Sequence, residues 1–116
     1  MRHRQARPIR LVVLDRDGVI NEDRENFIRC PEDWVPIEGS LRAIAQLNRA
    51  GIRVAIATNQ SGLARGLFEQ SDLEAIHREL ERELSKLEGH LDGIFICPHG
   101  PSDGCECRKP RPGLLL

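Results

Sequence analysis

The chain has 116 residues, 40% of them hydrophobic and 30% charged, which is enough for one small domain with a core. Lysine and arginine total 17 against 18 for aspartate and glutamate, and aromatic residues are scarce, which argues against a nucleic-acid or membrane partner. No apolar run approaches the length of a membrane span. We expect residues 1–8 to be a basic disordered tail and residues 9–116 to form a single domain of a cytoplasmic protein.

The first predicted element is a strand over Leu11–Leu14, which leads directly into Asp15-Arg16-Asp17-Gly18. Its unbroken branched apolar residues are typical of a strand that is buried on both faces in a parallel sheet. Open α/β sheets bind ligands where such strands end. Asp15 is therefore suited to metal binding and nucleophilic attack, and Asp17 to proton transfer in the same pocket. A plain polar turn is the alternative for these four residues taken alone.

A strand–helix–strand unit follows this acidic end. Residues 22–30 predict a loop above it, from which substrate contacts are commonly made. An extended segment over residues 34–39 leads to a helix with Ser40 as its N-cap and Gly51 just beyond its C-terminus. A second strand is predicted over residues 52–57. The short links predict a right-handed parallel crossover.

The clearest helical pattern covers residues 71–88. Ser71 and Glu74 predict a capping box at its start, and Gly89 marks its end. We expect His77 to lie on the polar, solvated side of this helix.

Polar clusters follow all the predicted strands, the last of which covers residues 93–97. Residues 58–62 (Thr-Asn-Gln-Ser-Gly) offer a hydroxyl, amides and backbone N–H groups that suit a phosphate, although a polar turn is the alternative. Arg108 and Lys109 add cations suited to anionic groups, and a solvated surface pair is the alternative. Because the ends of parallel strands meet at one edge, this convergence predicts an enzyme.

A further cluster predicts a structural zinc site. The pattern C-x-H-x5-C-x-C provides three thiolates and one imidazole, the closed tetrahedral set of a structural zinc, from Cys97, His99, Cys105 and Cys107. Free thiols or a disulfide are the alternative for these residues. We expect zinc to shape the loop that carries Arg108 and Lys109 without taking part in catalysis.

Together these motifs resemble the haloacid dehalogenase superfamily, from about Leu11 to the last residue. The resemblance rests on Asp15-x-Asp17-Gly-Val-Ile-Asn, on residues 58–62, on the cysteine–histidine cluster and on residues 108–110 (Arg-Lys-Pro). Within the superfamily the chain is most similar to phosphatases that remove the 7-phosphate of D-glycero-D-manno-heptose 1,7-bisphosphate on the route to ADP-heptose and lipopolysaccharide. Histidinol-phosphate phosphatases are close relatives, and the run over residues 61–66 favours the heptose branch.

The resemblance implies a three-layer, Rossmann-like α/β fold with a parallel sheet and a zinc-binding loop, of which this chain holds the N-terminal part. It also implies that Asp15 forms an aspartyl-phosphate and that Asp17 protonates the leaving sugar oxygen and then activates water. Mg²⁺ would bind the carboxylate of Asp15 and the backbone carbonyl of Asp17, and Thr58 and Lys109 would hold the phosphoryl group. The implied substrate contacts are Asp23, Arg24, Glu25, Asn26, Thr58, Asn59, Gln60, Ser61, Arg108 and Lys109.

One departure from the family pattern concerns the C-terminal end. The family's next strand, which carries a further magnesium-binding acid, does not occur before Leu116. We therefore expect a truncated or partial sequence whose first strand has an uncovered apolar edge, with weak magnesium binding and low or no turnover. Dimerisation across that edge and a pseudoenzyme are the alternatives.

The expected partner is a small phosphorylated sugar, and the complete protein is expected to be a monomer. Histidinol-phosphate hydrolysis is the alternative activity. A catalytically silent, zinc-stabilised binding module is the alternative from outside the enzymes.

Overall fold

The computed structural model describes residues 10–24 and 27–97. Strands and helices alternate along this part of the chain, as the sequence predicts. The elements are β1 (Leu11–Leu14), the 3₁₀ helix η1 (Pro31–Asp33), α1 (Ser40–Arg49), β2 (Arg53–Asn59), α2 (Gln70–Ser85) and β3 (Gly93–Cys97). The predicted strands and helices are thus present. β1 and β3 have the predicted ends, those of β2, α1 and α2 are shifted by a few residues, and η1 is an addition.

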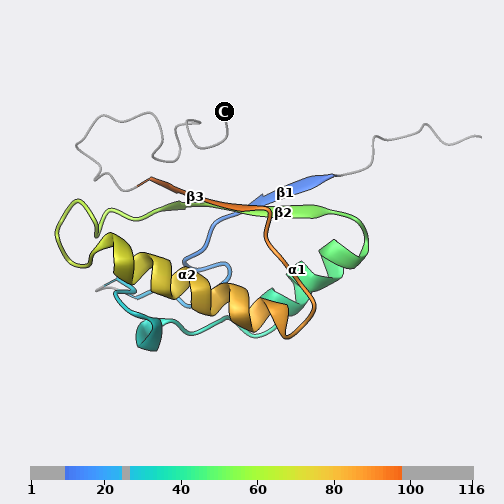
Figure 1. The fold of residues 1–116 in the computed structure, drawn as a ribbon, viewed down its shortest axis with the longest axis horizontal. Coiled ribbons are helices and arrows are strands. Elements are labelled where there is room, and N and C mark those ends of the chain that lie inside the picture. Colours follow the sequence, from blue (N-terminus) through green and yellow to red (C-terminus); the bar gives the residue numbers. More distant parts are fainter. Residues whose placement is uncertain (1–9, 25–26, 98–116) are drawn as a thin grey trace, which may run out of the picture.

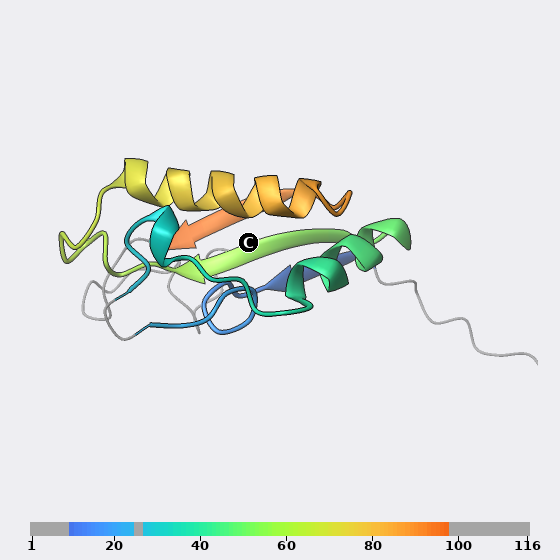
Figure 2. The same cartoon turned by 90° about the horizontal axis from the view of Figure 1, so that it is seen from below.

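The strands form one parallel sheet in the order β1-β2-β3. Leu14 of β1 pairs with Ile56 of β2, and Asn59 at the end of β2 pairs with Cys97 at the end of β3. The arrows of β2 and β3 accordingly point the same way (Figure 2). The residues that follow the strands are therefore brought to one edge of the sheet, as predicted.

Both long helices cover the same face of the sheet (Figure 1). This follows from the topology, because right-handed crossovers that keep adding strands in one direction leave their helices on one side. The described residues consequently make two layers, a sheet and a helical layer. A third layer, as the resemblance implied, is not formed by this part of the chain.

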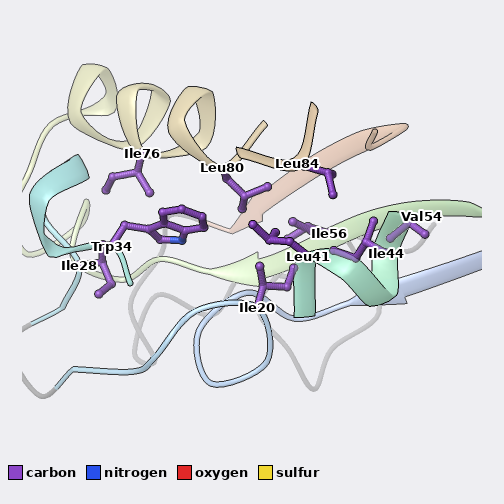
Figure 3. Packing of buried hydrophobic residues seen from close by; sticks show 10 residues of the cluster. All are labelled: Ile20, Ile28, Trp34, Leu41, Ile44, Val54, Ile56, Ile76, Leu80 and Leu84. Atoms are coloured by element: carbon purple, nitrogen blue, oxygen red, sulfur yellow. The ribbon is translucent and has the colours of Figure 1, made fainter. Parts of the chain in front are cut away.

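The core fills the space between the two layers (Figure 3). The β2 residues Val54 and Ile56 point into it, and Trp34 closes it near η1. The whole cluster of buried apolar residues consists of Ile20, Ile28, Trp34, Leu41, Ile44, Val54, Ile56, Ile76, Leu80 and Leu84. Its members come from β2, from both helices and from the segment between β1 and α1, so the core fixes the loop after β1 to the helical layer.

The prediction that β1 is buried on both faces is wrong for the described part of the chain. Leu11 is 53% and Val13 is 40% exposed, while Leu14 packs against the core. Phe95 of β3 is similarly 48% exposed. The physical reason is that β1 lies at the edge of the sheet and the helices cover only one of its faces. Within the described ranges these apolar side chains are exposed, and the expectation of an uncovered apolar edge, which concerns the whole chain, stays a prediction.

Both predicted N-caps are wrong by a residue or two. The N-cap of α1 is Gly39, which has a φ of +87°, whereas the hydroxyl of Ser40 donates a 2.7 Å hydrogen bond to the carbonyl of Val19. The N-cap of α2 is Glu69, whose N–H donates to the carboxylate of Asp72 over 2.8 Å, so the capping box lies two residues before the predicted one.

The turn after α2 depends on a glycine for space. A Cβ at Gly89 would lie 2.6 Å from Cδ1 of Leu84 and 3.2 Å from the Cα of Ala45. The left-handed residue of this turn is the preceding Glu88, with a φ of +63°. The predicted closing role of Gly89 therefore rests on close approach between α1 and the end of α2.

In the described ranges, no helix combines the length and the apolar character that crossing a membrane requires.

We predict a large difference in stability cost between the two faces of the sheet. Leu80→Ala removes a fully buried side chain from the core and is expected to lower the free energy of unfolding by about 2–5 kcal/mol. Leu11→Ala, on the exposed face, is expected to cost less than about 1 kcal/mol. Urea unfolding followed by circular dichroism measures both, and equal costs would contradict the one-sided core.

Candidate active site

The turn after β1 is held by its own backbone. The carbonyl of Arg16 accepts N–H groups from Val19, Ile20 and Asn21 at 2.8–3.2 Å, and Gly18 donates to the carbonyl of Asn21 over 2.7 Å. Gly18 has a φ of +83°, which favours glycine. The predicted sharp turn at Gly18 is confirmed, and it leaves the side chains of Asp15 and Asp17 at the end of the strand.

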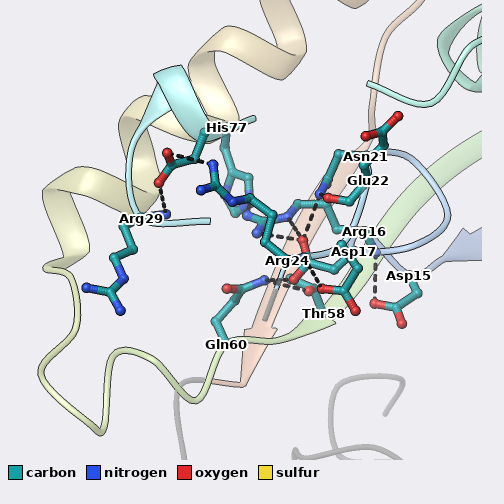
Figure 4. A network of polar contacts seen from close by, with 12 residues as sticks. Asp15, Arg16, Asp17, Asn21, Glu22, Arg24, Arg29, Thr58, Gln60 and His77 are labelled. Atoms are coloured by element: carbon teal, nitrogen blue, oxygen red, sulfur yellow. Dashed lines mark hydrogen bonds and ion pairs between the residues drawn. The ribbon is translucent and has the colours of Figure 1, made fainter. Parts of the chain in front are cut away.

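The two carboxylates of this turn have different surroundings (Figure 4). Asp15 is exposed, and its Oδ1 accepts the backbone N–H of Arg16 over 2.8 Å. The side chain of Asp17 is only 24% exposed, and its Oδ1 accepts donors from Arg16 and Asn21 at 2.9 and 3.0 Å. Asp15 is thus accessible to a ligand, whereas Asp17 is held in one orientation.

The strongest contact of Asp17 comes from a buried cation. The side chain of Arg16 is 0% exposed, and its Nε and Nη2 lie 2.9 and 2.8 Å from Oδ1 of Asp17. Its Nη1 lies 3.0 Å from Nε2 of His77 on α2. A guanidinium has only donors, so Nε2 of His77 must accept and its ring must be neutral.

The prediction that His77 is solvated is wrong. His77 is 7% exposed and packs on the inner side of α2. Leu73, Leu80 and Leu84 lie four residues before, three after and seven after it, so the sequence does place His77 on the apolar stripe. The role of Arg16 was also missed, because an arginine between two aspartates looks like a surface residue until the turn buries it.

The end of β2 is linked to the end of β1. The amide nitrogen of Gln60 donates to Oδ2 of Asp17 over 3.1 Å and to Oγ1 of Thr58 over 3.0 Å. Gln60 and Thr58 are each 1% exposed, Ser61 is 7% exposed and Asn59 is partly exposed. The structure therefore brings the predicted second cluster against Asp17, with Gln60 as the connection.

The loop that was predicted to cover the site is tied to η1. Arg24 and Asp33 form a 2.8 Å ion pair, and the N–H of Arg29 donates to the other oxygen of Asp33 over 3.1 Å. This backbone hydrogen bond, with the charge of Arg24, holds the pKa of Asp33 below its ordinary value. Across the loop, the guanidinium of Arg65 lies 5.6 Å from the ring centre of Phe27.

Several predicted site residues lie outside the described part of the chain. These are Glu25, Asn26, His99, Cys105, Cys107, Arg108 and Lys109. Asp23 is described and exposed, and Cys97, at the end of β3, is buried.

The described residues fit a magnesium ion in part. Magnesium is commonly bound through one or two carboxylates, with substrate phosphate and water completing its shell. Asp15 supplies an exposed carboxylate, whereas both carboxylate oxygens of Asp17 already accept donors, so the contribution expected of Asp17 is its backbone carbonyl. Residues 10–24 and 27–97 contain no group of three or more His, Cys, Asp or Glu side chains that could hold a metal. The donor set thus suits magnesium shared with a phosphate.

Comparison with known proteins identifies the family. The sequence profile described as Polynucleotide kinase 3 phosphatase matches residues 10–116. The chain belongs to this family. Its membership confirms the expected kinship with phosphatases of the haloacid dehalogenase type, and the converging acidic turn and polar strand end lie within the family's matched region.

Relatives within this family have closely similar sequences. A D-glycero-beta-D-manno-heptose-1,7-bisphosphate 7-phosphatase of Bordetella bronchiseptica is 54% identical over 106 residues, 91% of this chain and 59% of that protein. The phosphatase of the same name from Pseudomonas putida is 53% identical, over 92% of this chain and 61% of its own length. The chain thus spans about three-fifths of these relatives.

A solved structure shows the same fold. The crystal structure of the B. bronchiseptica D,D-heptose 1,7-bisphosphate phosphatase, complexed with magnesium and phosphate, superposes with a TM-score of 0.90 at 53% identity. The match covers 92% of this chain and 60% of that one.

We predict that His77 makes stability depend on pH. Burial, with repulsion from Arg16, lowers the pKa of His77 from 6.5 to about 4, while Asp17 acts in the opposite direction. Its neutral form therefore stabilises the fold fully above pH 6.5, and this contribution, about 3 kcal/mol at most, is lost as the pH falls toward 4.

Urea unfolding at pH 7 and pH 4.5 measures this loss. His77→Gln should weaken the dependence, whereas His90→Gln, at an exposed histidine, should keep it. The charged groups that line the surface beside His77, namely Glu74, Arg78 and Glu81, are the same in all three proteins, so the comparison isolates the imidazole. Equal slopes for the wild type and His77→Gln would contradict the assignment.

Proposed function

We propose that this chain is the N-terminal part of a cytoplasmic phosphatase that removes the 7-phosphate of D-glycero-D-manno-heptose 1,7-bisphosphate. The product would serve the synthesis of ADP-heptose for lipopolysaccharide. The observation that carries the proposal is the pair of carboxylates after β1, one exposed and one held by buried donors, in a chain 54% identical to a phosphatase of that name.

In the proposed first step, a carboxylate oxygen of Asp15 attacks phosphorus. An O–P bond to Asp15 forms while the bond from phosphorus to the sugar oxygen breaks. Asp17 gives its proton to the departing sugar oxygen. The exposure of Asp15 supports the attacking role, and the fixed orientation of Asp17 supports the role of proton donor.

In the second step, water replaces the enzyme at phosphorus. Asp17, now ionised, takes a proton from the water molecule as it attacks the aspartyl-phosphate. The bond between phosphorus and Asp15 breaks, inorganic phosphate leaves, and Asp17 is again protonated. One carboxylate thus serves both steps, which requires that it keep its position between them.

The surrounding residues would hold the substrate. Asp15 and Asp17 would bind Mg²⁺, which supplies positive charge between the attacking carboxylate and the phosphate. Thr58 and Lys109 would hold the phosphoryl oxygens, and Arg108 the remote part of the substrate. Asp23 and Arg24, which are exposed, would contact the sugar together with Glu25 and Asn26, since loops at this edge commonly do.

The deciding variant is Asp15→Asn. It removes the nucleophile with little change in shape, so phosphate release from the heptose bisphosphate in Mg²⁺ should fall by at least about 10³-fold. Asp92→Asn is the matched control. Asp92 lies just before β3, at the amino ends of the strands and away from Asp15, and it pairs with Arg53 at the start of β2. The control should keep wild-type rates.

The assay uses the mass-verified 116-residue chain with histidinol phosphate in parallel. Faster release from histidinol phosphate would favour the alternative substrate. Turnover that survives Asp15→Asn would show that Asp15 is not the nucleophile. Silence on both substrates would agree with the expected low or no turnover and would indicate that the chemistry needs residues that the 116-residue chain lacks.

We also propose a structural zinc ion, bound by Cys97, His99, Cys105 and Cys107. The thiolate and imidazole donors suit zinc, and four protein ligands leave no position for a catalytic water. The buried position of Cys97 at the end of β3 supports this proposal, because a ligand there would tie the following loop to the edge that carries Asp15 and Asp17.

Metal analysis tests the zinc proposal independently of activity. The purified chain should contain about one zinc per molecule. Cys107→Ser should lose it, whereas Cys30→Ser, at a cysteine outside the proposed ligand set, should retain it. A stably folded wild-type chain without zinc would contradict the site.

A further inference from the structure

Arg16 is a buried cation whose contacts join two elements. Its side chain is 0% exposed beneath the turn after β1, and His77 approaches it from α2, 61 residues later in the chain. Both lie beside the apolar core, where Ile76 and Leu80 of α2 are fully buried. A charge in such a place is strongly destabilising unless all its neighbours are arranged to accept from it.

The guanidinium has two acceptors in fixed directions. Its Nε donates to Oδ1 of Asp17, its Nη2 lies 2.8 Å from the same oxygen without making a hydrogen bond, and its Nη1 points to Nε2 of His77 (Figure 4). A planar guanidinium that is anchored on opposite sides cannot rotate without breaking one contact. The imidazole of His77 therefore determines the plane in which Arg16 meets Asp17.

Besides Arg16, two amide side chains donate to the carboxylate of Asp17. Asn21 donates to Oδ1 over 3.0 Å, and Gln60 donates to Oδ2 over 3.1 Å. Both amides are buried and anchored elsewhere as well, Asn21 on the carbonyl of Glu22 and Gln60 on Oγ1 of Thr58. Arg16 differs from them in its full positive charge and in placing two nitrogens within 2.9 Å of one oxygen. Among the described contacts of Asp17, the one that depends on α2 is thus the charged one.

We propose that His77 is a positioning residue for Asp17, acting through Arg16. This inference rests on the proposed phosphatase function, in which Asp17 transfers a proton in both steps. His77 touches neither substrate nor reacting atoms. Its imidazole holds the guanidinium, and the guanidinium holds the carboxylate at the orientation that proton transfer needs.

A purely structural role for His77 predicts different consequences. The stripe of α2 on which His77 lies is otherwise filled by leucine and isoleucine, so an apolar residue would satisfy packing alone. Nη2 of Arg16 is already buried without a hydrogen-bond partner, so loss of the acceptor at Nε2 would leave a second nitrogen, Nη1, in the same state and allow the guanidinium to turn. Catalysis would then suffer in the chemical step more than in substrate binding.

The kinetic test compares two variants with a control. In Mg²⁺ and heptose 1,7-bisphosphate, His77→Leu should lower kcat about tenfold or more while KM stays within about twofold. His77→Gln, whose carbonyl oxygen can accept in place of Nε2, should recover kcat to within about threefold of the wild type. His90→Gln should not differ from the wild type, since His90 is exposed.

The second readout is the Arg16 Nε–H resonance in ¹H–¹⁵N spectra, which needs no turnover. It should be sharp in the wild type and in His77→Gln, because a buried hydrogen bond slows its exchange, and should broaden or shift in His77→Leu. Circular dichroism at the assay temperature establishes that each variant is folded.

The kinetic and the NMR measurements distinguish a failure of the proposed phosphatase function from a failure of the positioning role of His77. A wild type without turnover would match the low activity expected of this chain, and the Arg16 resonance alone would then decide whether His77 holds Arg16. An unchanged resonance in His77→Leu would overturn the positioning role, as would an unchanged kcat in an active enzyme. Equal losses of kcat in His77→Leu and His77→Gln would also overturn it.

Discussion

The described structure depends on the burial of one guanidinium under the turn after β1. The side chain of Arg16 has no access to solvent. It forms an ion pair with Asp17 and donates a hydrogen bond to a neutral His77 on α2. A buried cation with one partner missing is strongly destabilising, so the position of α2 and the conformation of the turn are linked. The same contacts orient the carboxylate that we propose to transfer the proton.

The parallel sheet supplies the other constraint. Its strand ends lie at one edge, which brings Thr58 and Gln60 beside Asp17 although more than forty residues separate them along the chain. Among the described residues, the hydrophobic core packs against β2 on the face that the helices cover, and it holds the strand ends in place from that side. The site is therefore built on rigid strands at its base, and its upper part consists of loops tied by contacts such as the Arg24–Asp33 ion pair.

The two aspartates illustrate how one turn separates two chemical roles. Asp15 is exposed and suited to meet a phosphate, whereas Asp17 receives donors from Arg16, Asn21 and Gln60. The spacing of one residue places them at the same strand end, and the positive φ of Gly18 turns the backbone away from both. The relatives of the same family, at 53–54% identity, share the fold in which we propose this chemistry.

The sequence alone determined the order of strands and helices, the acidic turn at Asp15–Gly18 and the phosphatase kinship, because local apolar periodicity and short motifs are properties of neighbouring residues. It could not determine which faces are covered, and so β1 was wrongly predicted to be buried on both. The spacing of the leucines on α2 does place His77 on the apolar stripe, but the burial of Arg16 and its contact with His77 were decided only by tertiary structure. Their contact joins residues 61 positions apart, and no pattern within either segment specifies that a charged and an imidazole side chain will meet inside the fold.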